Sequence, residues 1–257
     1  MSLEKIKLLG ICASPRRGNS LFLLKKAFEA ARSLPEAERI STSMVELRSL
    51  TIAPCTGCEA CAKIRGECVI EDGFQKVRDL WVEADVALYS VPVFHLGIPG
   101  QLKCFLDRLG NSQRKVYKVP SPRRLKVIGV LCQGSHLFAG QELTIAFLHQ
   151  HAVLMNCIPV SGDGWESYLG AAGWTRAQKA GDALEKEYGQ KEMDAQVAVR
   201  ACETLARRCV EMAFILKAGG RALEGRLRAD LAYAAFLKNL DPSQSEGSGL
   251  IPEEKGE

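Results

Sequence analysis

Four cysteines are the most specific chemical signal in the sequence. The motif C-x2-C-x2-C-x6-C is formed by Cys55, Cys58, Cys61 and Cys68. Three thiols at every third position of a loop or tight turn can converge on one point. The six residues before Cys68 include a glycine, which allows the chain to turn so that the fourth thiol points to the same place. Iron-sulfur clusters are held by thiolates in such arrangements. The motif therefore predicts a metal site within residues 51–72, and its spacing favours a cubane cluster.

Zinc is the alternative occupant of this motif, because four thiolates at the corners of a tetrahedron also satisfy it. Structural zinc usually uses two separated C-x2-C pairs, whereas three of these cysteines follow one another at three-residue spacing. Loop thiols without a ligand would be open to oxidation. The other six cysteines lie in apolar segments and are expected to pack in the core: Cys12, Cys104, Cys132, Cys157, Cys202 and Cys209.

A second candidate site is the string SPRRGNS at residues 14–20. It follows an apolar run and opens a helical pattern, where free backbone amides and the helix dipole favour a phosphate group. Gly18 permits close approach of the backbone, and the side chains suited to phosphate oxygens are Ser14, Arg16, Asn19 and Ser20. The string contains neither GxxxxGK nor GxGxxG. It suits a phosphomonoester such as that of FMN, or else an ordinary connection in which Asn19 and Ser20 cap the helix.

The elements around these residues predict an α/β fold. Apolar runs typical of buried parallel strands occur at residues 6–12, 84–93, 124–132 and 157–161, and residues 40–47 alternate like an edge strand. Helical periodicity lies between them, at residues 21–31, 74–85, 101–109 and 141–154. This alternation predicts a doubly wound, five-stranded parallel sheet whose ligands bind at the carboxyl ends of the strands. Residues 176–218 are expected to form two long helices that close the domain.

Composition limits the class of protein. The 257 residues carry 34 basic and 30 acidic side chains, a net charge of +4 without a basic cluster, so nucleic acid is not an expected partner. No apolar stretch is long enough to cross a bilayer. Ten cysteines without an export signal indicate reduced thiols and a cytoplasmic protein. We expect one domain over residues 1–218 and a helical extension with a disordered tail over 219–257.

Two separated segments resemble the NADPH-dependent FMN reductase group of flavodoxin-like proteins: GICASPRRGNS at 10–20 and SVPVFHLGIPGQLKCFLDRL at 90–109. The resemblance implies that the first segment holds the FMN phosphate. It implies that the second surrounds the ribityl chain and the flavin ring through Pro92, Val93, Phe94, His95, Leu96 and Gly97. A third segment of that family corresponds here to Gln133, Gly134 and Ser135.

The cysteine motif at this point of such a chain resembles the iron-sulfur flavoprotein branch of the same family. That branch implies a 4Fe-4S cluster beside FMN in a homodimer or homotetramer, with the cluster and flavin of neighbouring subunits brought together. We therefore expect an electron-transfer oxidoreductase that takes electrons from ferredoxin or NAD(P)H and uses no catalytic side chain. The alternatives are an NAD(P)H-dependent FMN or quinone reductase with a structural metal site, and a non-catalytic redox-sensing or carrier module.

Overall fold

The fold is a parallel α/β sheet covered by helices on both faces. A computed structural model describes residues 4–116, 122–178 and 180–240. The strands are β1 (Ile6–Cys12), β2 (Ile40–Glu46), β3 (Val86–Pro92), β4 (Val127–Gly134), β5 (Ile158–Pro159) and β6 (Ala171–Trp174). Their order is β2-β1-β3-β4-β5, with β6 also paired to β4, and every pairing is parallel. The predicted α/β class and doubly wound sheet are confirmed.

The sheet has six strands among the described residues, so the prediction of five is wrong by one short strand. β5 pairs with the beginning of β4, where Val127 lies opposite Ile158. β6 pairs with the end of β4, where Gly134 lies opposite Trp174. The two strands thus share one edge position, interrupted by residues 160–170. β6 was missed because its four residues, Ala-Ala-Gly-Trp, are too few and too small to produce a strand pattern.

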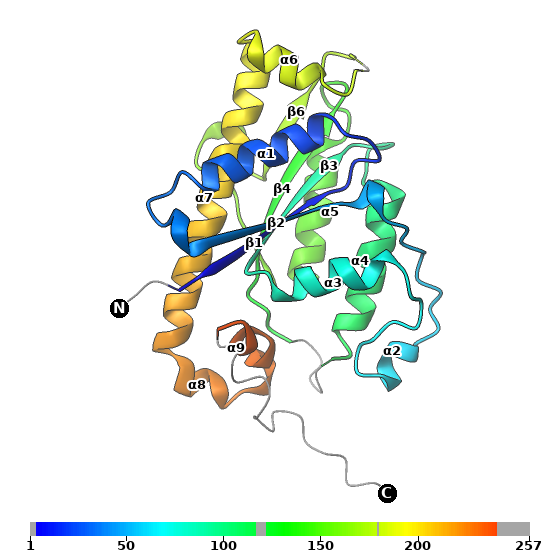
Figure 1. The fold of residues 1–257 in the computed structure, drawn as a ribbon, viewed down its shortest axis with the longest axis vertical. Coiled ribbons are helices and arrows are strands. Elements are labelled where there is room, and N and C mark those ends of the chain that lie inside the picture. Colours follow the sequence, from blue (N-terminus) through cyan, green and yellow to red (C-terminus); the bar gives the residue numbers. More distant parts are fainter. Residues whose placement is uncertain (1–3, 117–121, 179, 241–257) are drawn as a thin grey trace, which may run out of the picture.

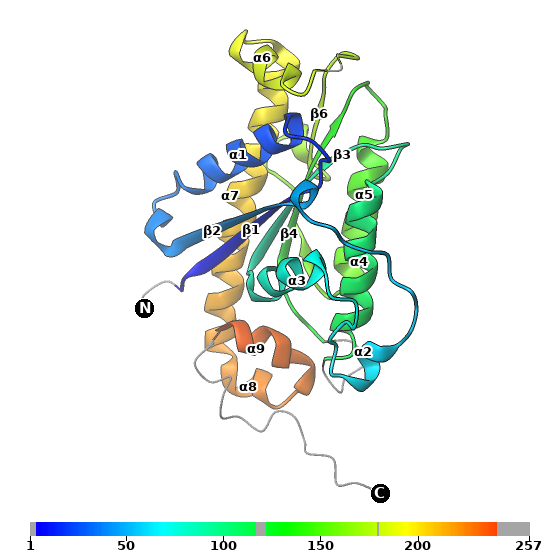
Figure 2. The same cartoon turned by 45° about the vertical axis from the view of Figure 1, so that its right-hand side comes forward.

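Helices form one layer on each face of the sheet (Figures 1 and 2). One layer contains α1 (Asn19–Ala31) and α7 (Met193–Ala222), and the other contains α3 (Gly73–Glu83), α4 (Gly100–Gln113) and α5 (Gln141–Leu154). Each layer buries its apolar stripe against a different side of the strands, which is why β3 is buried along its whole length. The core therefore consists of two apolar layers separated by the sheet.

The remaining helices are short. They are α2 (Ala60–Lys63), α6 (Ala183–Gly189), α8 (Glu224–Arg228) and α9 (Ala234–Leu240), with single 3-10 turns at Ala37–Arg39, Leu47–Ser49, Trp165–Ser167 and Leu231–Tyr233. The expectation of two long helices over 176–218 is wrong, because α6 has 7 residues and α7 has 30. α7 continues past residue 218 to Ala222. Of the predicted disordered tail, residues 241–257 lie outside the described residues.

Within the described residues, none of the helices combines the length and the apolar character that crossing a membrane requires.

Candidate functional site

Three predicted segments lie together at the carboxyl end of the sheet. We call residues 13–20, 92–97 and 133–135 the loop edge, because they lie at or directly after the carboxyl ends of β1, β3 and β4. The main-chain amide of Val93 donates to the carbonyl of Gln133 at 2.8 Å, and that of Ala13 donates to Ser90 at 2.9 Å. The two bonds join residues that are 40 and 77 positions apart in the chain. This is the place where ligands bind in open parallel sheets.

The segment after β3 closes in a tight hairpin turn. Phe94 and Gly97 exchange two main-chain hydrogen bonds, of 2.8 and 3.0 Å, around His95 and Leu96. Both central residues have left-handed backbone angles, with φ of 47° and 64°, which is costly for side chains other than glycine. Such strain is concentrated at ligand sites in proteins. The side chains of Phe94, His95 and Leu96 are exposed at this turn.

The phosphate-type loop opens α1 without a side-chain cap. The N-cap residue is Gly18, so the expectation that Asn19 and Ser20 cap the helix is wrong, since both lie within its first turn. The side chain of Asn19 instead accepts a hydrogen bond from the amide of Leu184 at 3.1 Å. Ser14 is buried, and its hydroxyl donates to the carbonyl of Arg16 at 2.7 Å. The uncapped first turn keeps backbone donors available for an anion.

Residues 176–178 and 180–184 are a part of this edge that sequence reasoning missed. The amide of Ala177 donates to the carbonyl of Ser135 at 2.7 Å, so the segment contacts the loop after β4. The backbone of Gly181 packs directly against Gly18 of the phosphate-type loop. No local pattern reports these contacts, because the partners are separated by 42 and 163 residues in the sequence.

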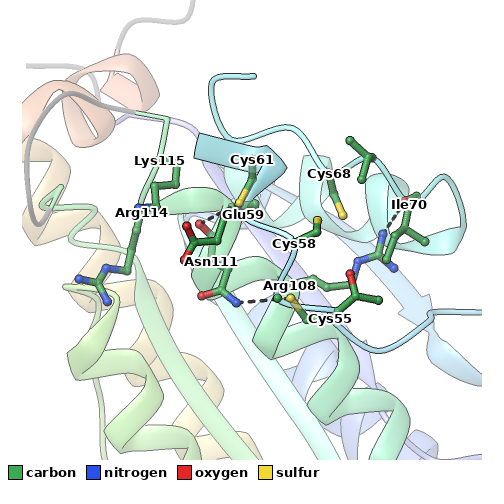
Figure 3. Close-up of a pocket in the computed structure, with 14 residues that line it drawn as sticks. Cys55, Cys58, Glu59, Cys61, Cys68, Ile70, Arg108, Asn111, Arg114 and Lys115 are labelled. Atoms are coloured by element: carbon green, nitrogen blue, oxygen red, sulfur yellow. Dashed lines mark hydrogen bonds between the residues drawn. The ribbon is translucent and has the colours of Figure 1, made fainter. Parts of the chain in front are cut away.

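The four motif cysteines line a single cavity of about 410 Å³, which we call the cysteine cavity (Figure 3). Across it, α4 and the residues after it present Arg108, Asn111, Arg114 and Lys115. Nowhere in residues 4–116, 122–178 and 180–240 do three or more His, Cys, Asp or Glu side chains form a group that could hold a metal ion. The structure therefore brings the cysteines to one cavity, and their role as ligands stays a prediction.

Left-handed residues shape the cysteine segment. Gly57 and Glu59 bracket Cys58 with φ of 67° and 56°, and Gly66 has φ of 84° between Cys61 and Cys68. The amide of Gly66 donates to the carbonyl of Cys61 at 2.8 Å. A Cβ atom on Gly66 would overlap the side chain of Val116 and lie 2.7 Å from the carbonyl oxygen of Ser112. The sequence therefore needs glycine at position 66 to turn the chain back against α4.

Arg108 holds both ends of the cysteine segment. Its side chain is 1% exposed, and its guanidinium donates to Asp72 at 2.7 Å and to the carbonyls of Ala53 at 3.3 Å and Ile70 at 2.6 Å. Asp72 also accepts from the amides of Ala53 and Phe74, both at 2.8 Å, and caps α3. The ion pair with Arg108 and these amides lower the pKa of Asp72 despite the opposing effect of burial. Arg108 lies 40 residues after Cys68, which explains why the motif alone did not point to it.

The thiols differ sharply between the two regions. Hydrogen bonds from the Ala60 amide and then from the Thr56 side chain lower the pKa of the exposed Cys58. Burial raises the pKa of Cys12 to about 11 and that of Cys132 to about 12. The expected core cysteines are buried at positions 12, 132, 157, 202 and 209, and Cys104 is partly buried. Only the motif cysteines therefore combine proximity with access to solvent or to a cavity.

Comparisons with known proteins agree with this architecture. Residues 6–166 match the family described as NADPH-dependent FMN reductase. An iron-sulfur flavoprotein of Methanocaldococcus jannaschii is 30% identical over 185 residues, which is 72% of this chain and 90% of that protein. An iron-sulfur flavoprotein of Archaeoglobus fulgidus is 29% identical over 180 residues, which is 70% and 88% of the two chains. The azoreductase structure from Bacillus anthracis has a TM-score of 0.55 at 15% identity, covers 79% of this chain and 99% of that one, and is similar in fold.

Proposed function

Because the chain belongs to the NADPH-dependent FMN reductase family and is a flavin-dependent oxidoreductase, we propose that it carries FMN at the loop edge and a 4Fe-4S cluster in the cysteine cavity. The family match confirms the resemblance of the two loop segments to FMN reductases, and these relatives confirm the resemblance of the cysteine motif to iron-sulfur flavoproteins. FMN exchanges one or two electrons when bound, and an iron-sulfur cluster exchanges one at a time. The protein therefore converts between electron pairs and single electrons.

The observation that carries the proposal is the donor set of the cysteine cavity. Four thiols from one segment face a common space of about 410 Å³, and Asn111 already donates to the Cys55 sulfur at 3.4 Å. An all-sulfur donor set with a nearby amide donor suits an iron-sulfur cluster. Cys55, Cys58, Cys61 and Cys68 would hold it. The cavity's volume favours a group larger than a single ion.

The loop edge fits FMN through its backbone donors. The uncapped first turn of α1 and the side chain of Arg16 supply donors for a phosphomonoester, and the Ser14 hydroxyl would join them by turning from the Arg16 carbonyl to the ligand. The hairpin from Pro92 to Gly97 and the segment from Gln133 to Ser135 border the same edge, where their main chains are fixed by the bond between Val93 and Gln133. These residues would bind and orient the flavin, and no side chain is required as acid, base or nucleophile.

The two sites lie at opposite ends of α4, which supports an oligomeric enzyme. The helix begins just after the hairpin at the loop edge and ends beside the cysteine cavity, and its 14 residues span about 21 Å. Direct contact between a flavin and a cluster would then require two chains. Apolar side chains that follow the loop edge in the chain are available for such an interface. Phe138 is 89% exposed, and it lines a cavity of about 270 Å³ together with Leu137 and Leu143. We expect a homodimer or homotetramer, which light scattering after size-exclusion chromatography would measure.

The surface around the cysteine cavity favours an acidic protein as electron donor. Lys63 and Arg65 are exposed on the segment that carries the cysteines, and Arg114 and Lys115, also exposed, line the cavity from the end of α4. A reduced ferredoxin would be attracted to them electrostatically, and NAD(P)H is the donor at the flavin. Replacing Lys63 and Arg65 by glutamate should slow reduction by ferredoxin and leave bleaching of the flavin by NADPH unchanged. Equal slowing of both reactions would contradict this division. The reduced thiols fit a cytoplasmic site of action.

The decisive test is anaerobic purification with a visible spectrum and measurement of FMN, iron, acid-labile sulfide and zinc. We expect the protein to contain FMN, iron and acid-labile sulfide, with the iron and the sulfide in equal molar amounts. A Cys61→Ala variant should lose the iron and sulfide and keep the flavin. Flavin accompanied by zinc, with no sulfide, would instead identify a reductase with a structural metal site. Turnover with small electron acceptors would exclude a non-catalytic sensor or carrier.

A further inference from the structure

Asn111 bridges two of the four motif cysteines from another element. Its side-chain amide donates to the sulfur of Cys55 at 3.4 Å, and its main-chain carbonyl accepts from the thiol of Cys61 at 3.8 Å (Figure 3). Asn111 is exposed, so its amide is not needed to satisfy a buried polar group. It lies on the same face of α4 as Arg108, which precedes it by one turn.

We propose that the side-chain amide of Asn111 donates a hydrogen bond to the Cys55 sulfur of the cysteine-held cluster and thereby raises the reduction potential of that cluster. This inference rests on the proposed iron-sulfur cluster. Reduction adds one electron and makes the sulfur atoms more negative, so that a donated N–H bond stabilises the reduced state more than the oxidised state. Asn111 acts through the Cys55 sulfur and is a positioning residue, with no contact to a substrate.

The test compares two variants of Asn111 with a control on the same helix. Asn111→Leu removes the donor at nearly constant size, and Asn111→Asp adds a negative charge in its place. Gln101→Leu is the control, because Gln101 anchors the chain ahead of the motif by donating to the carbonyls of Leu47 and Leu50, and it touches no cysteine sulfur. Anaerobically purified protein is analysed for iron and sulfide, and the cluster is titrated electrochemically with its electron paramagnetic resonance signal as readout.

We expect each variant to retain its iron. The midpoint potential of the cluster should fall in Asn111→Leu and fall further in Asn111→Asp. Gln101→Leu should keep the wild-type potential and lose thermal stability. An unchanged potential in an iron-loaded Asn111→Leu protein would overturn the inference, as would an equal shift in Gln101→Leu. If the leucine variant loses iron, the smaller uncharged variant Asn111→Ala takes its place and is judged by the same criterion. Wild-type protein without iron would overturn the cluster itself, and that result is distinct from a cluster whose potential ignores Asn111.

Discussion

The loop edge and the cysteine cavity are held in place in different ways. The loop edge is formed by main-chain groups at the ends of β1, β3 and β4, so the sheet itself positions it. The cysteine cavity depends on a long connection with one single-turn helix, and a side chain from α4 ties that connection down. A ligand site built on the sheet follows from the fold, whereas a site on a connection needs specific anchoring residues. The two regions should therefore fail separately when their supports are changed.

Thiol reactivity should give the largest contrast between the two regions. In protein prepared without iron, Cys58 is exposed with a lowered pKa, while Cys12 and Cys132 lie buried in the strands that lead to the loop edge, with their pKa values raised to about 11 and about 12. Each unit of pKa above neutrality lowers the thiolate fraction about tenfold. Near neutral pH, iodoacetamide should modify Cys58 more than about 100 times faster than Cys12 or Cys132. Mass spectrometry of the peptides measures this ratio.

Loading the iron-free protein with FMN provides the control for this experiment. Labelling of Cys58 should not change, since the loop edge and the cysteine cavity lie at opposite ends of α4. Labelling of Cys12 at a rate comparable to that of Cys58 would show that β1 opens in solution. The strands of the loop edge would then be less firmly held than their burial indicates.

Removal of Arg108 should be the most damaging single change to the cysteine cavity. Arg108→Leu leaves Asp72 and two carbonyls without their donor, and breaking a buried ion pair in this way costs about 3–5 kcal/mol. For a chain of this size that corresponds to a fall in Tm of roughly 6 to 20 °C, measured by differential scanning calorimetry. The iron content should fall together with the stability. The amount of FMN bound by the folded protein should stay unchanged.

Arg114→Leu is the matched control for Arg108. The side chain of Arg114 is exposed and points away from the sulfur atoms in Figure 3. Its replacement should change the free energy of unfolding by no more than about 0.5 kcal/mol. If Arg108→Leu behaved like this control, the segment would be held by its own turns and the proposed contrast with the loop edge would be wrong.

Sequence patterns predicted these two regions to different extents. The loop edge followed from apolar runs and a loop string, because parallel strands must end at one edge and their loops must meet there. The cysteine spacing predicted which thiols share a cavity. It could not reveal Arg108 or Asn111, since neither residue belongs to a local pattern and their contacts span 36 to 56 residues. The strand β6, which shares the sheet edge with β5, was missed for the same reason. Residues 171–174 form a strand because they pair with β4, and their own sequence shows no strand preference.

Glycine substitutions should give the smallest effects and the finest distinction. Gly57 and Gly66 both have left-handed backbone angles, so an alanine at either position costs about 1 kcal/mol from the backbone. Gly57 has open space around it, whereas a Cβ on Gly66 would overlap Val116 and approach the carbonyl of Ser112. Forcing extra atoms into a packed place adds about 1–3 kcal/mol. Urea unfolding of the two variants measures the difference.

The comparison of the two variants isolates the contact between the cysteine segment and the end of α4. If Gly66→Ala loses about 1–3 kcal/mol more than Gly57→Ala and also loses iron, then close packing on α4 sets the position of the cavity. FMN content should be equal in both variants, because neither glycine touches the loop edge. Equal losses of stability would mean that the chain after Cys61 rearranges freely. The shape of the cysteine cavity would then depend more on the bound metal group than on the protein. The loop edge differs in this respect, because the sheet holds it in position.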